Sequence, residues 1–198
     1  MNNICNIVSI NDGWLEQIEQ QPSPYFSARD GAGDCGQDSA DEISLLVVHN
    51  ISLPPGKFGG GYITDLFLGQ LDENADPYFK GIAQLQVSAH CLIRRDGHII
   101  QYVSFNDKAW HAGVSVFNGH QQCNNFSIGI ELEGTDDIPY TQVQYQQLVA
   151  LVKKLQASYP LISHNNIVGH CDIAPNRKTD PGKSFDWPYF NQCMIDVK

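Results

Sequence analysis

The sequence is poor in basic residues and has no long apolar run. Its 198 residues include 12 Lys and Arg against 22 Asp and Glu, which gives a formal net charge of -10. Because nucleic-acid affinity depends on clustered Lys and Arg, this balance argues against a protein that binds a phosphate backbone. No segment is long and apolar enough to span a bilayer. We therefore expect neither nucleic-acid binding nor membrane insertion.

The start of the chain lacks the basic stretch, apolar run and small-residue cleavage site of an export signal. The sequence has six cysteines, but no two of them form a Cys-x-x-Cys pair. In a chain of this length without an export signal, cysteines are expected to stay reduced. These features together predict a cytoplasmic protein.

Two further absences limit the possible folds and functions. No internal repeat or low-complexity tract indicates a second domain. The glycine run at 59–61 is not followed by the Lys-Ser/Thr pair of a phosphate-binding loop, so a flexible rim is the better interpretation.

Five segments are predicted to be strands from apolar runs, alternation and turn residues. They are 45–48, 89–94, 98–103, 126–133 and 166–170. Asp96-Gly97 joins the second and third as an antiparallel hairpin, because Asp-Gly favours a tight turn. The first is apolar throughout, as expected for a strand that is covered on both faces.

The clearest helix signal follows Thr141, which forms a predicted capping box with Gln144 and precedes apolar residues at helical spacing as far as Tyr159. Shorter helices are predicted at about 62–68 and 79–84. Residues 20–42 are rich in Gly, Ser, Asp and Pro and predict a loop that wraps around the core without building it. The whole pattern predicts an α/β or α+β domain with a mixed central sheet flanked by helices.

The most informative stretch is the loop GHCDIAPNRKTDPG, which carries His170, Lys178 and Asp180. Catalytic zinc sites commonly use three protein ligands with N or O donors and leave a fourth position for water. His170 and Asp180 would supply two ligands. His49, which closes the first strand, is the best third candidate, although a single histidine is more often a packed or capping residue. Spacing alone leaves open whether the three side chains converge.

Alternation along 126–133 predicts that Phe126, Ile128, Ile130 and Leu132 face one side of the sheet, while Glu131 and Glu133 share the other. Burial on an apolar strand raises the pKa of a carboxyl toward the range of a general base. The alternative is a solvated residue on an exposed face of the sheet. Because Glu131 and Glu133 are predicted to face the same side, alternation does not show which of them is the candidate general base.

Two other groups are candidates for substrate chemistry. Lys178 could stabilise an oxyanion beside a metal, although a lone Lys in a polar loop is usually a surface charge. Trp110 and His111 could offer an aromatic platform to a sugar or peptide, although Trp110 is more often a core anchor.

Six long segments are informative when they are taken together and in order. They are LLVVHNISLPPGKFGGGYITDLF, QVSAHCLIRRDGHIIQYV, AWHAGVS, NNFSIGIELEGTDD, YTQVQYQQL and GHCDIAPNRKTDPG. These segments resemble the AmpD family of cytosolic 1,6-anhydro-N-acetylmuramyl-L-alanine amidases. The resemblance covers roughly 44–190, so we expect a zinc amidase domain at 44–190, preceded by an irregular wrapping segment at 1–43 and followed by a C-terminal tail at 191–198. It implies a peptidoglycan-recognition-like fold in which a mixed sheet is flanked by helices.

The resemblance also implies roles for individual residues. The zinc ligands of the family match His49, His170 and Asp180, its catalytic glutamate matches Glu131, and its catalytic lysine matches Lys178. Asn50, Trp110, His111 and Arg177 fall in segments that line the substrate groove of the family.

Two positions depart from the family pattern. Gln86, before VSAH, and Gln122, before Cys123, stand where family members carry Arg. Each change removes a guanidinium that could pair with a carboxylate or a sugar oxygen. Strictness for the 1,6-anhydro sugar therefore does not follow from the sequence.

The resemblance implies a small-molecule muropeptide substrate, a zinc cofactor and hydrolysis of the bond between the muramic acid lactyl group and L-alanine during peptidoglycan recycling. One alternative is a non-catalytic muropeptide sensor, which a chelator-sensitive turnover assay would distinguish. Another is an exported or phage-type lysin, which would act on polymeric sacculi better than on soluble anhydro-muropeptide.

Overall fold

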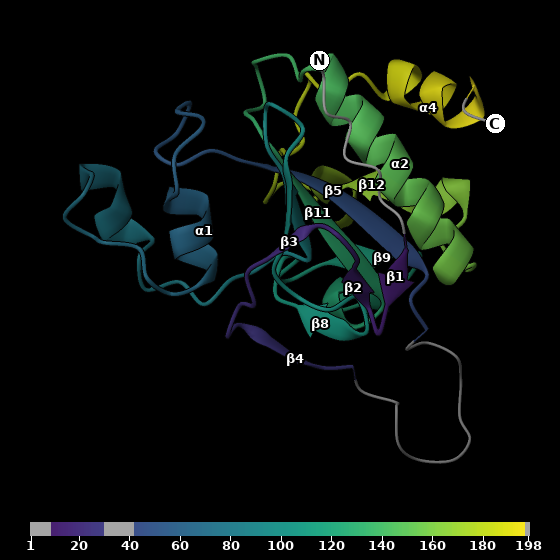
Figure 1. Ribbon diagram of the computed structural model, residues 1–198, viewed down its shortest axis with the longest axis horizontal. Helices are drawn as coiled ribbons and strands as arrows, with labels where there is room; N and C mark the ends of the chain where they lie inside the picture. Colours follow the sequence, from purple (N-terminus) through teal and green to yellow (C-terminus); the bar gives the residue numbers. More distant parts are fainter. Residues whose placement is uncertain (1–8, 30–41, 197–198) are drawn as a thin grey trace.

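The fold was analysed in a computed structural model of the chain, in which residues 9–29 and 42–196 are described. A six-stranded mixed sheet forms its centre (Figure 1). In spatial order the strands are β12 (Ile167–Gly169), β5 (Leu45–Ile51), β11 (Ser127–Glu133), β6 (Cys91–Ile93), β7 (Ile99–Gln101) and β3 (Glu19–Gln20). The first four run parallel to one another, and β6 and β7 form the predicted antiparallel hairpin. The predicted fold class is confirmed, and so are the five predicted strands, which correspond to β5, β6, β7, β11 and β12; β3 was not predicted.

One face of the sheet is covered by α2 (Gln142–Ser158), with α4 (Trp187–Asp196) beside it (Figure 1). The Thr141 side chain accepts a hydrogen bond from the backbone N–H of Gln144, and the Gln144 side chain accepts one from the backbone of Thr141, so the predicted capping box is present. Alternate strand residues, among them Val48 and Ile130, point into this layer and form the largest apolar cluster. The regular spacing of apolar residues along α2 is thus explained by one buried contact face.

The opposite face of the sheet carries the chain's polar chemistry. Val47 points to this side together with a smaller apolar cluster. Toward β6 and β7 a second cluster joins the sheet to α1 (Tyr62–Phe67) and to the 3-10 helix η1 (Pro77–Gly81). These two helices lie to the left in Figure 1, away from α2, and form a lobe beside the sheet.

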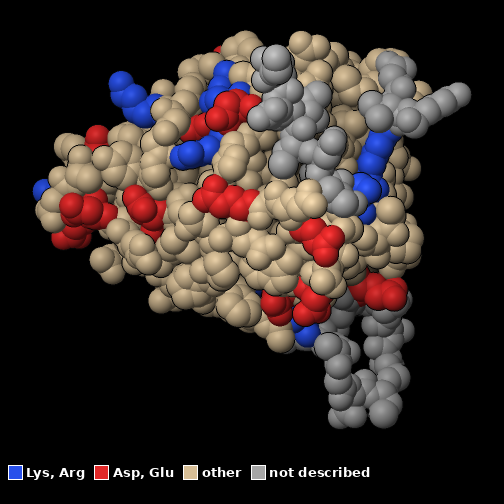
Figure 2. Space-filling view, viewed as in Figure 1, with Lys and Arg blue, Asp and Glu red and all other residues tan. Residues whose placement is uncertain are grey.

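The remaining elements are short and lie around this framework. They are β1 (Ile10–Asn11), β2 (Trp14–Leu15), β4 (Phe26–Ala28), β8 (Asp107–Ala109), β9 (Val116–Phe117), β10 (His120–Gln121), η2 (Cys123–Asn125), η3 (His164–Asn166) and α3 (His170–Ile173). None of the helices in the described part of the chain has the length and apolarity needed to cross a membrane. The four described cysteines are free, and acidic and basic side chains are interspersed on the face shown in Figure 2.

Two local predictions are wrong. The helix expected at about 79–84 is the 3-10 turn at Pro77–Gly81, because Pro77 starts it and the Asp76 side chain accepts from the N–H of Tyr78. Phe126 does not share a side with Ile128. It ends η2 before the strand begins and packs into the smaller cluster on the opposite face.

The ends of the chain are more regular than the sequence indicated. The described part of 1–43 contains four short strands, of which β3 is an edge of the central sheet, and Leu15 lies in the main core. Strands of two or three residues show no periodicity, so composition alone suggested a loop. At the other end, residues 191–196 of the expected tail belong to α4. Part of the loop predicted at 20–42 lies outside the described residues.

Arg29 fastens the N-terminal segment to the core. Its buried guanidinium donates hydrogen bonds to the backbone carbonyls of Phe105, Asn124, Asn125 and Ser127, at distances between 2.8 and 3.3 Å. Burial lowers the pKa of Arg29 to about 10. One side chain therefore holds together the end of β4, the loop before β8, and the entry to β11.

We predict that Arg29→Met lowers the free energy of unfolding by about 2 to 4 kcal/mol, because buried carbonyls lose their donors. Urea unfolding followed by circular dichroism measures the change. The exposed Lys80 provides a control, since Lys80→Met should change stability by no more than about 0.5 kcal/mol. Equal stability of the two variants would contradict the role given to Arg29.

Candidate functional site

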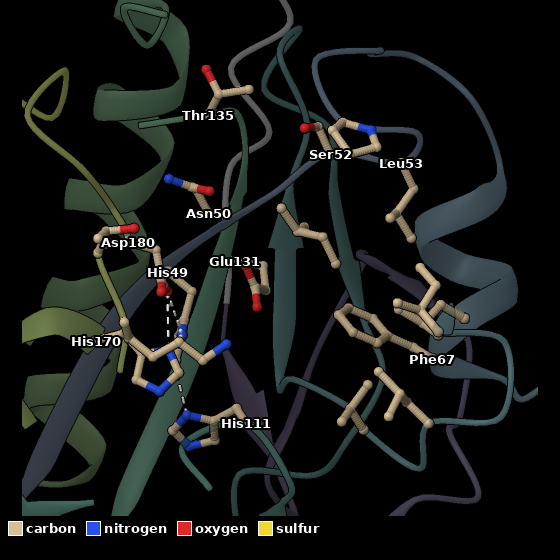
Figure 3. Close-up of a pocket in the computed structure, with 18 of the residues that line it drawn as sticks. His49, Asn50, Ser52, Leu53, Phe67, His111, Glu131, Thr135, His170 and Asp180 are labelled. Atoms are coloured by element: carbon tan, nitrogen blue, oxygen red, sulfur yellow. Dashed lines mark hydrogen bonds and ion pairs between the residues drawn. The ribbon is translucent and has the colours of Figure 1, made fainter. Parts of the chain in front are cut away.

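The candidate site lies where three parallel strands place their residues at one edge of the sheet. His49 in β5 pairs in register with Glu131 in β11. The strand β12 ends at Gly169, opposite Val48, and His170 follows as the first residue of α3. Parallel pairing therefore brings two histidines and a carboxylate from three distant segments side by side (Figure 3).

His49, His170 and Asp180 converge on one point. The two Nδ1 atoms are 3.0 Å apart, and Asp180 Oδ2 lies 3.1 Å from Nδ1 of His49 and 3.0 Å from Nδ1 of His170. Tetrahedral zinc with bonds of about 2.0 Å separates its ligand atoms by about 3.3 Å. These three donors, all within 4.8 Å of one another, could thus hold a metal ion with little rearrangement.

The electrostatics of the cluster suit a divalent cation. Burial, together with the neighbouring charges of His170 and Lys178, lowers the pKa of His49 to about 4, so its imidazole is neutral at pH 7. Burial raises the pKa of the Asp180 carboxyl, but its contacts with His170 and His49 outweigh that effect and hold the pKa well below its usual range. A neutral imidazole and an ionised carboxylate are the forms in which His49 and Asp180 can bind a metal.

Glu131 and Glu133 have different surroundings, although they point to the same side of β11. Burial, with a smaller contribution from Asp180, raises the pKa of Glu131 well above its usual range, and its Oε2 has no hydrogen-bond partner among the described residues. Glu133 instead accepts hydrogen bonds from the backbone N–H groups of Gly59 and Arg95. Only Glu131 lines the cavity next to the cluster, while Glu133 anchors two loops.

A cavity of about 550 Å³ opens above these residues. Its polar wall comes from β5, β11 and the loop that carries Lys178 and Asp180. Its opposite wall is apolar and is built by the lobe, with Leu53, Leu66 and Phe67 among its residues (Figure 3). A ligand bound here would meet charged chemistry on one side and a hydrophobic surface on the other.

The nine residues to which the family resemblance assigns roles all line this cavity. Asn50 donates from Nδ2 to Asp136 Oδ1 at 2.8 Å. The Trp110 indole N–H donates to Ser27 Oγ, and its ring stacks on Tyr25. The cluster, the two catalytic candidates and the four groove candidates therefore share one site.

His111 and Arg177 have partners inside the protein as well. Nδ1 of His111 lies 2.9 Å from His49 Nε2, and Nη2 of Arg177 donates to the carbonyls of Ala112 and Val114. These contacts join residues far apart in the sequence, and no local pattern indicated them.

Sequence reasoning missed the apolar wall and the residues behind the cluster. The wall comes from α1 and from short segments between 53 and 87. A helix was predicted at about 62–68, but no pattern indicated that its apolar residues line a cavity. Gln86 and Gln122, the two positions expected to depart from the family pattern, are both exposed, and neither is among the residues that line the cavity.

Comparison with known proteins shows to which family the chain is similar. Residues 39–183 match the family model described as N-acetylmuramoyl-L-alanine amidase. The 1,6-anhydro-N-acetylmuramyl-L-alanine amidase AmpD of Citrobacter freundii is 59% identical over 93% of this chain and 94% of its own length. A crystal structure of a selenomethionine AmpD derivative superposes with a TM-score of 0.86 at 57% identity, covering 93% of this chain and 98% of that one.

A more distant structure is the E. coli amidase AmiD in complex with its substrate, anhydro-N-acetylmuramic acid-L-Ala-D-gamma-Glu-L-Lys. It has a TM-score of 0.55 at 30% identity and covers 85% of this chain and 65% of that one. The family model, the relatives and the shared fold agree with one another. The chain therefore belongs to the AmpD family of N-acetylmuramoyl-L-alanine amidases.

Proposed function

We propose that this amidase uses zinc to hydrolyse the amide bond between N-acetylmuramic acid, in its 1,6-anhydro form, and the L-alanine of muropeptides. The observation that carries the proposal is the set of three mutually adjacent donors, His49, His170 and Asp180, beside the unpartnered carboxylate of Glu131. The names of the AmpD relatives support the choice of bond, and the AmiD complex supports the choice of ligand class.

The donor set favours zinc over other divalent cations. Imidazole nitrogens suit zinc, whereas magnesium and calcium prefer sites made only of oxygen. Three protein ligands with a fourth position open to solvent are typical of catalytic zinc. A zinc ion held by His49, His170 and Asp180 would lower the pKa of a bound water from about 16 to about 7 and would polarise the substrate carbonyl.

Glu131 is the proposed general base and acid. Its buried Oε2 would accept a proton from the attacking water as the new carbon–oxygen bond forms. Because the raised pKa favours the protonated form, the carboxyl can hold that proton. It would then deliver the proton to the alanine nitrogen as the carbon–nitrogen bond breaks. The products are the lactyl carboxylate of the anhydro sugar and a peptide with a free amino group.

Lys178 is the proposed stabiliser of the oxyanion. It lines the cavity on the loop that also carries Asp180, and its backbone N–H donates to Ala174 O, which holds the loop against α3. An ammonium group aimed at the carbonyl oxygen as it gains negative charge stabilises the transition state more than the ground state.

The remaining groove residues are proposed to place the substrate. Trp110 lines the cavity and would offer an aromatic surface to a sugar or peptide, while Asn50 and the exposed Arg177 would offer amide and guanidinium N–H groups to its carbonyls or carboxylates. His111 contributes to the same wall. We further propose that the enzyme works in the cytoplasm on wall fragments being recycled, the setting implied by the AmpD resemblance.

We predict that a strong chelator abolishes turnover of anhydro-muramyl tripeptide and that stoichiometric zinc restores it. Metal analysis gives the zinc content, and mass spectrometry identifies the products, which we expect to be 1,6-anhydro-N-acetylmuramic acid and free tripeptide. Full activity in the chelated protein would contradict the metal site. Binding of the muropeptide without cleavage, by the zinc-loaded chain, would instead support the non-catalytic sensor.

Glu131 and Glu133 form a matched pair for testing the proton-transfer role. Glu131→Gln should lower kcat by about 10² to 10⁴ and leave the zinc content unchanged, because a neutral amide cannot accept the proton. Glu133→Gln should keep most of the turnover and lose about 1 kcal/mol of stability, since its contacts are to backbone N–H groups. Near-normal hydrolysis by Glu131→Gln with zinc bound would refute the assignment.

Lys178 and Lys183 offer a similar comparison on one loop. Lys178→Met should lower kcat by about 10² to 10³ with little change in KM, because the lost donor acts on the developing oxyanion. Lys183→Met should leave kinetics unchanged, since Lys183 is exposed and pairs with Asp137 at the surface. Steady-state kinetics on both variants measure the difference, and equal kcat values would rule out the proposed role of Lys178.

A further inference from the structure

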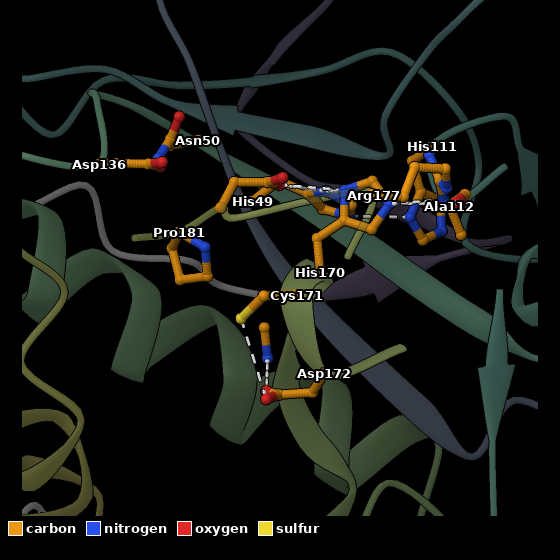
Figure 4. Close-up of polar contacts among 12 residues, drawn as sticks. His49, Asn50, His111, Ala112, Asp136, His170, Cys171, Asp172, Arg177 and Pro181 are labelled. Carbon is orange, nitrogen blue, oxygen red and sulfur yellow. Dashed lines mark hydrogen bonds and ion pairs between the residues drawn. The ribbon is translucent and has the colours of Figure 1, made fainter. Parts of the chain in front are cut away.

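The outer nitrogens of the two histidines in the cluster are held by two adjacent residues. Nε2 of His49 lies 2.9 Å from Nδ1 of His111, and Nε2 of His170 lies 3.1 Å from the carbonyl oxygen of Ala112. Figure 4 shows His111 and Ala112 together on the far side of the two imidazoles. One dipeptide thus contacts both rings at the nitrogens that point away from the cluster.

The contact with Ala112 determines where His170 carries its proton. A carbonyl oxygen can only accept a hydrogen bond, so His170 donates to it from Nε2. The Nδ1 atom of the neutral ring then presents a lone pair toward Asp180. The carbonyl also accepts from Nη2 of Arg177 at 2.6 Å, which holds it in position. The same Nη2 lies 3.4 Å from Nε2 of His170, a longer contact than either of those with the carbonyl.

The contact with His111 can do the same for His49. For Nδ1 of His49 to bind a metal, the ring proton must sit on Nε2, and a buried N–H needs an acceptor. Nδ1 of His111 is that acceptor at 2.9 Å. The proton of His111 is then on Nε2, which lies 3.0 Å from Ser127 Oγ. A chain of hydrogen bonds therefore runs from the cluster to a buried serine on β11.

The dipeptide is itself held from two sides. Oδ1 of Asn124 accepts from the backbone N–H groups of His111 and Ala112, at 3.2 and 2.8 Å. Gly129 lies against the His111 ring, and a Cβ at that position would come within 2.4 Å of its Cγ. Since the backbone of Gly129 does not need a positive φ, this glycine is required by the ring next to it.

We propose that His111-Ala112 is the element that orients both histidine ligands, and that His111 is a positioning residue for the metal site. This inference rests on the proposed zinc site and deepens it. It also changes the role expected for His111 from the sequence. Both ring nitrogens are used inside the protein, which leaves only ring carbon to line the groove.

Three variants separate the hydrogen bond from the bulk of the ring. His111→Phe keeps a ring of similar shape without an acceptor. His111→Asn removes the ring but returns an oxygen close to the position of Nδ1. Gly129→Ala leaves the chemistry of His111 unchanged and displaces the ring. The exposed His164 provides the control variant His164→Phe.

Zinc affinity is measured by competition with a chromophoric chelator, and folding by thermal unfolding of the metal-free proteins. We predict that His111→Phe and Gly129→Ala weaken zinc binding about 10- to 100-fold, the usual effect of losing an outer hydrogen bond to a metal-bound histidine. His111→Asn should recover most of the affinity, and His164→Phe should match the wild type. A merely structural role for His111 would not produce this order.

Long-range proton–nitrogen NMR of the zinc-loaded wild type reads the tautomers directly, so the inference stays testable if a variant does not fold. His49, His170 and His111 should each carry the ring proton on Nε2. Wild-type affinity in His111→Phe, or a proton on Nδ1 of His111, would overturn the inference and leave the proposed zinc site standing. A wild-type chain that binds no zinc would overturn both.

Discussion

The parallel, in-register pairing of β5 with β11 and β12 is the constraint on which the rest of the structure depends. It places His49 beside Glu131 and brings His170 next to both, because the carboxyl ends of parallel strands meet at one edge. The face toward α2 is filled by apolar side chains, which leaves the other face free for polar groups. A slip of one residue in β11 would turn Glu131 into the core and Ile130 into the cavity.

Around that framework the protein has several layers of support. The Nε2 atoms of His49 and His170 contact His111 and Ala112. The backbone N–H groups of His111 and Ala112 in turn donate to the side chain of Asn124. Arg29, from the N-terminal segment, donates to the carbonyl of Asn124 and to that of Ser127, at the start of β11. The described part of the N-terminal segment therefore stabilises the strand that carries Glu131. A site held in this way keeps its geometry before substrate arrives, as efficient catalysis requires.

Much of this could be predicted from the sequence, for identifiable reasons. The apolar run before His49, the Asp-Gly turn and the capping box at Thr141 are local patterns, and local patterns predicted β5, the β6–β7 hairpin and α2. The alternation of side chains along the strand could not show whether Glu131 or Glu133 is the candidate general base. That difference depends on Gly59 and Arg95, which belong to other segments and donate hydrogen bonds to Glu133. The short strands near the N-terminus, the apolar wall of the lobe and the contact between His111 and His49 all depend on tertiary packing, which leaves no periodic trace.

The central claim is that His49, His170 and Asp180 together hold a zinc ion beside Glu131. It is tested most directly by anomalous diffraction at the zinc absorption edge from crystals of the loaded protein. The account predicts a single strong peak within about 2.0 to 2.2 Å of His49 Nδ1, His170 Nδ1 and Asp180 Oδ2. A peak bound to other atoms, or no peak in the crystals of a protein shown to hydrolyse the muropeptide, would contradict it.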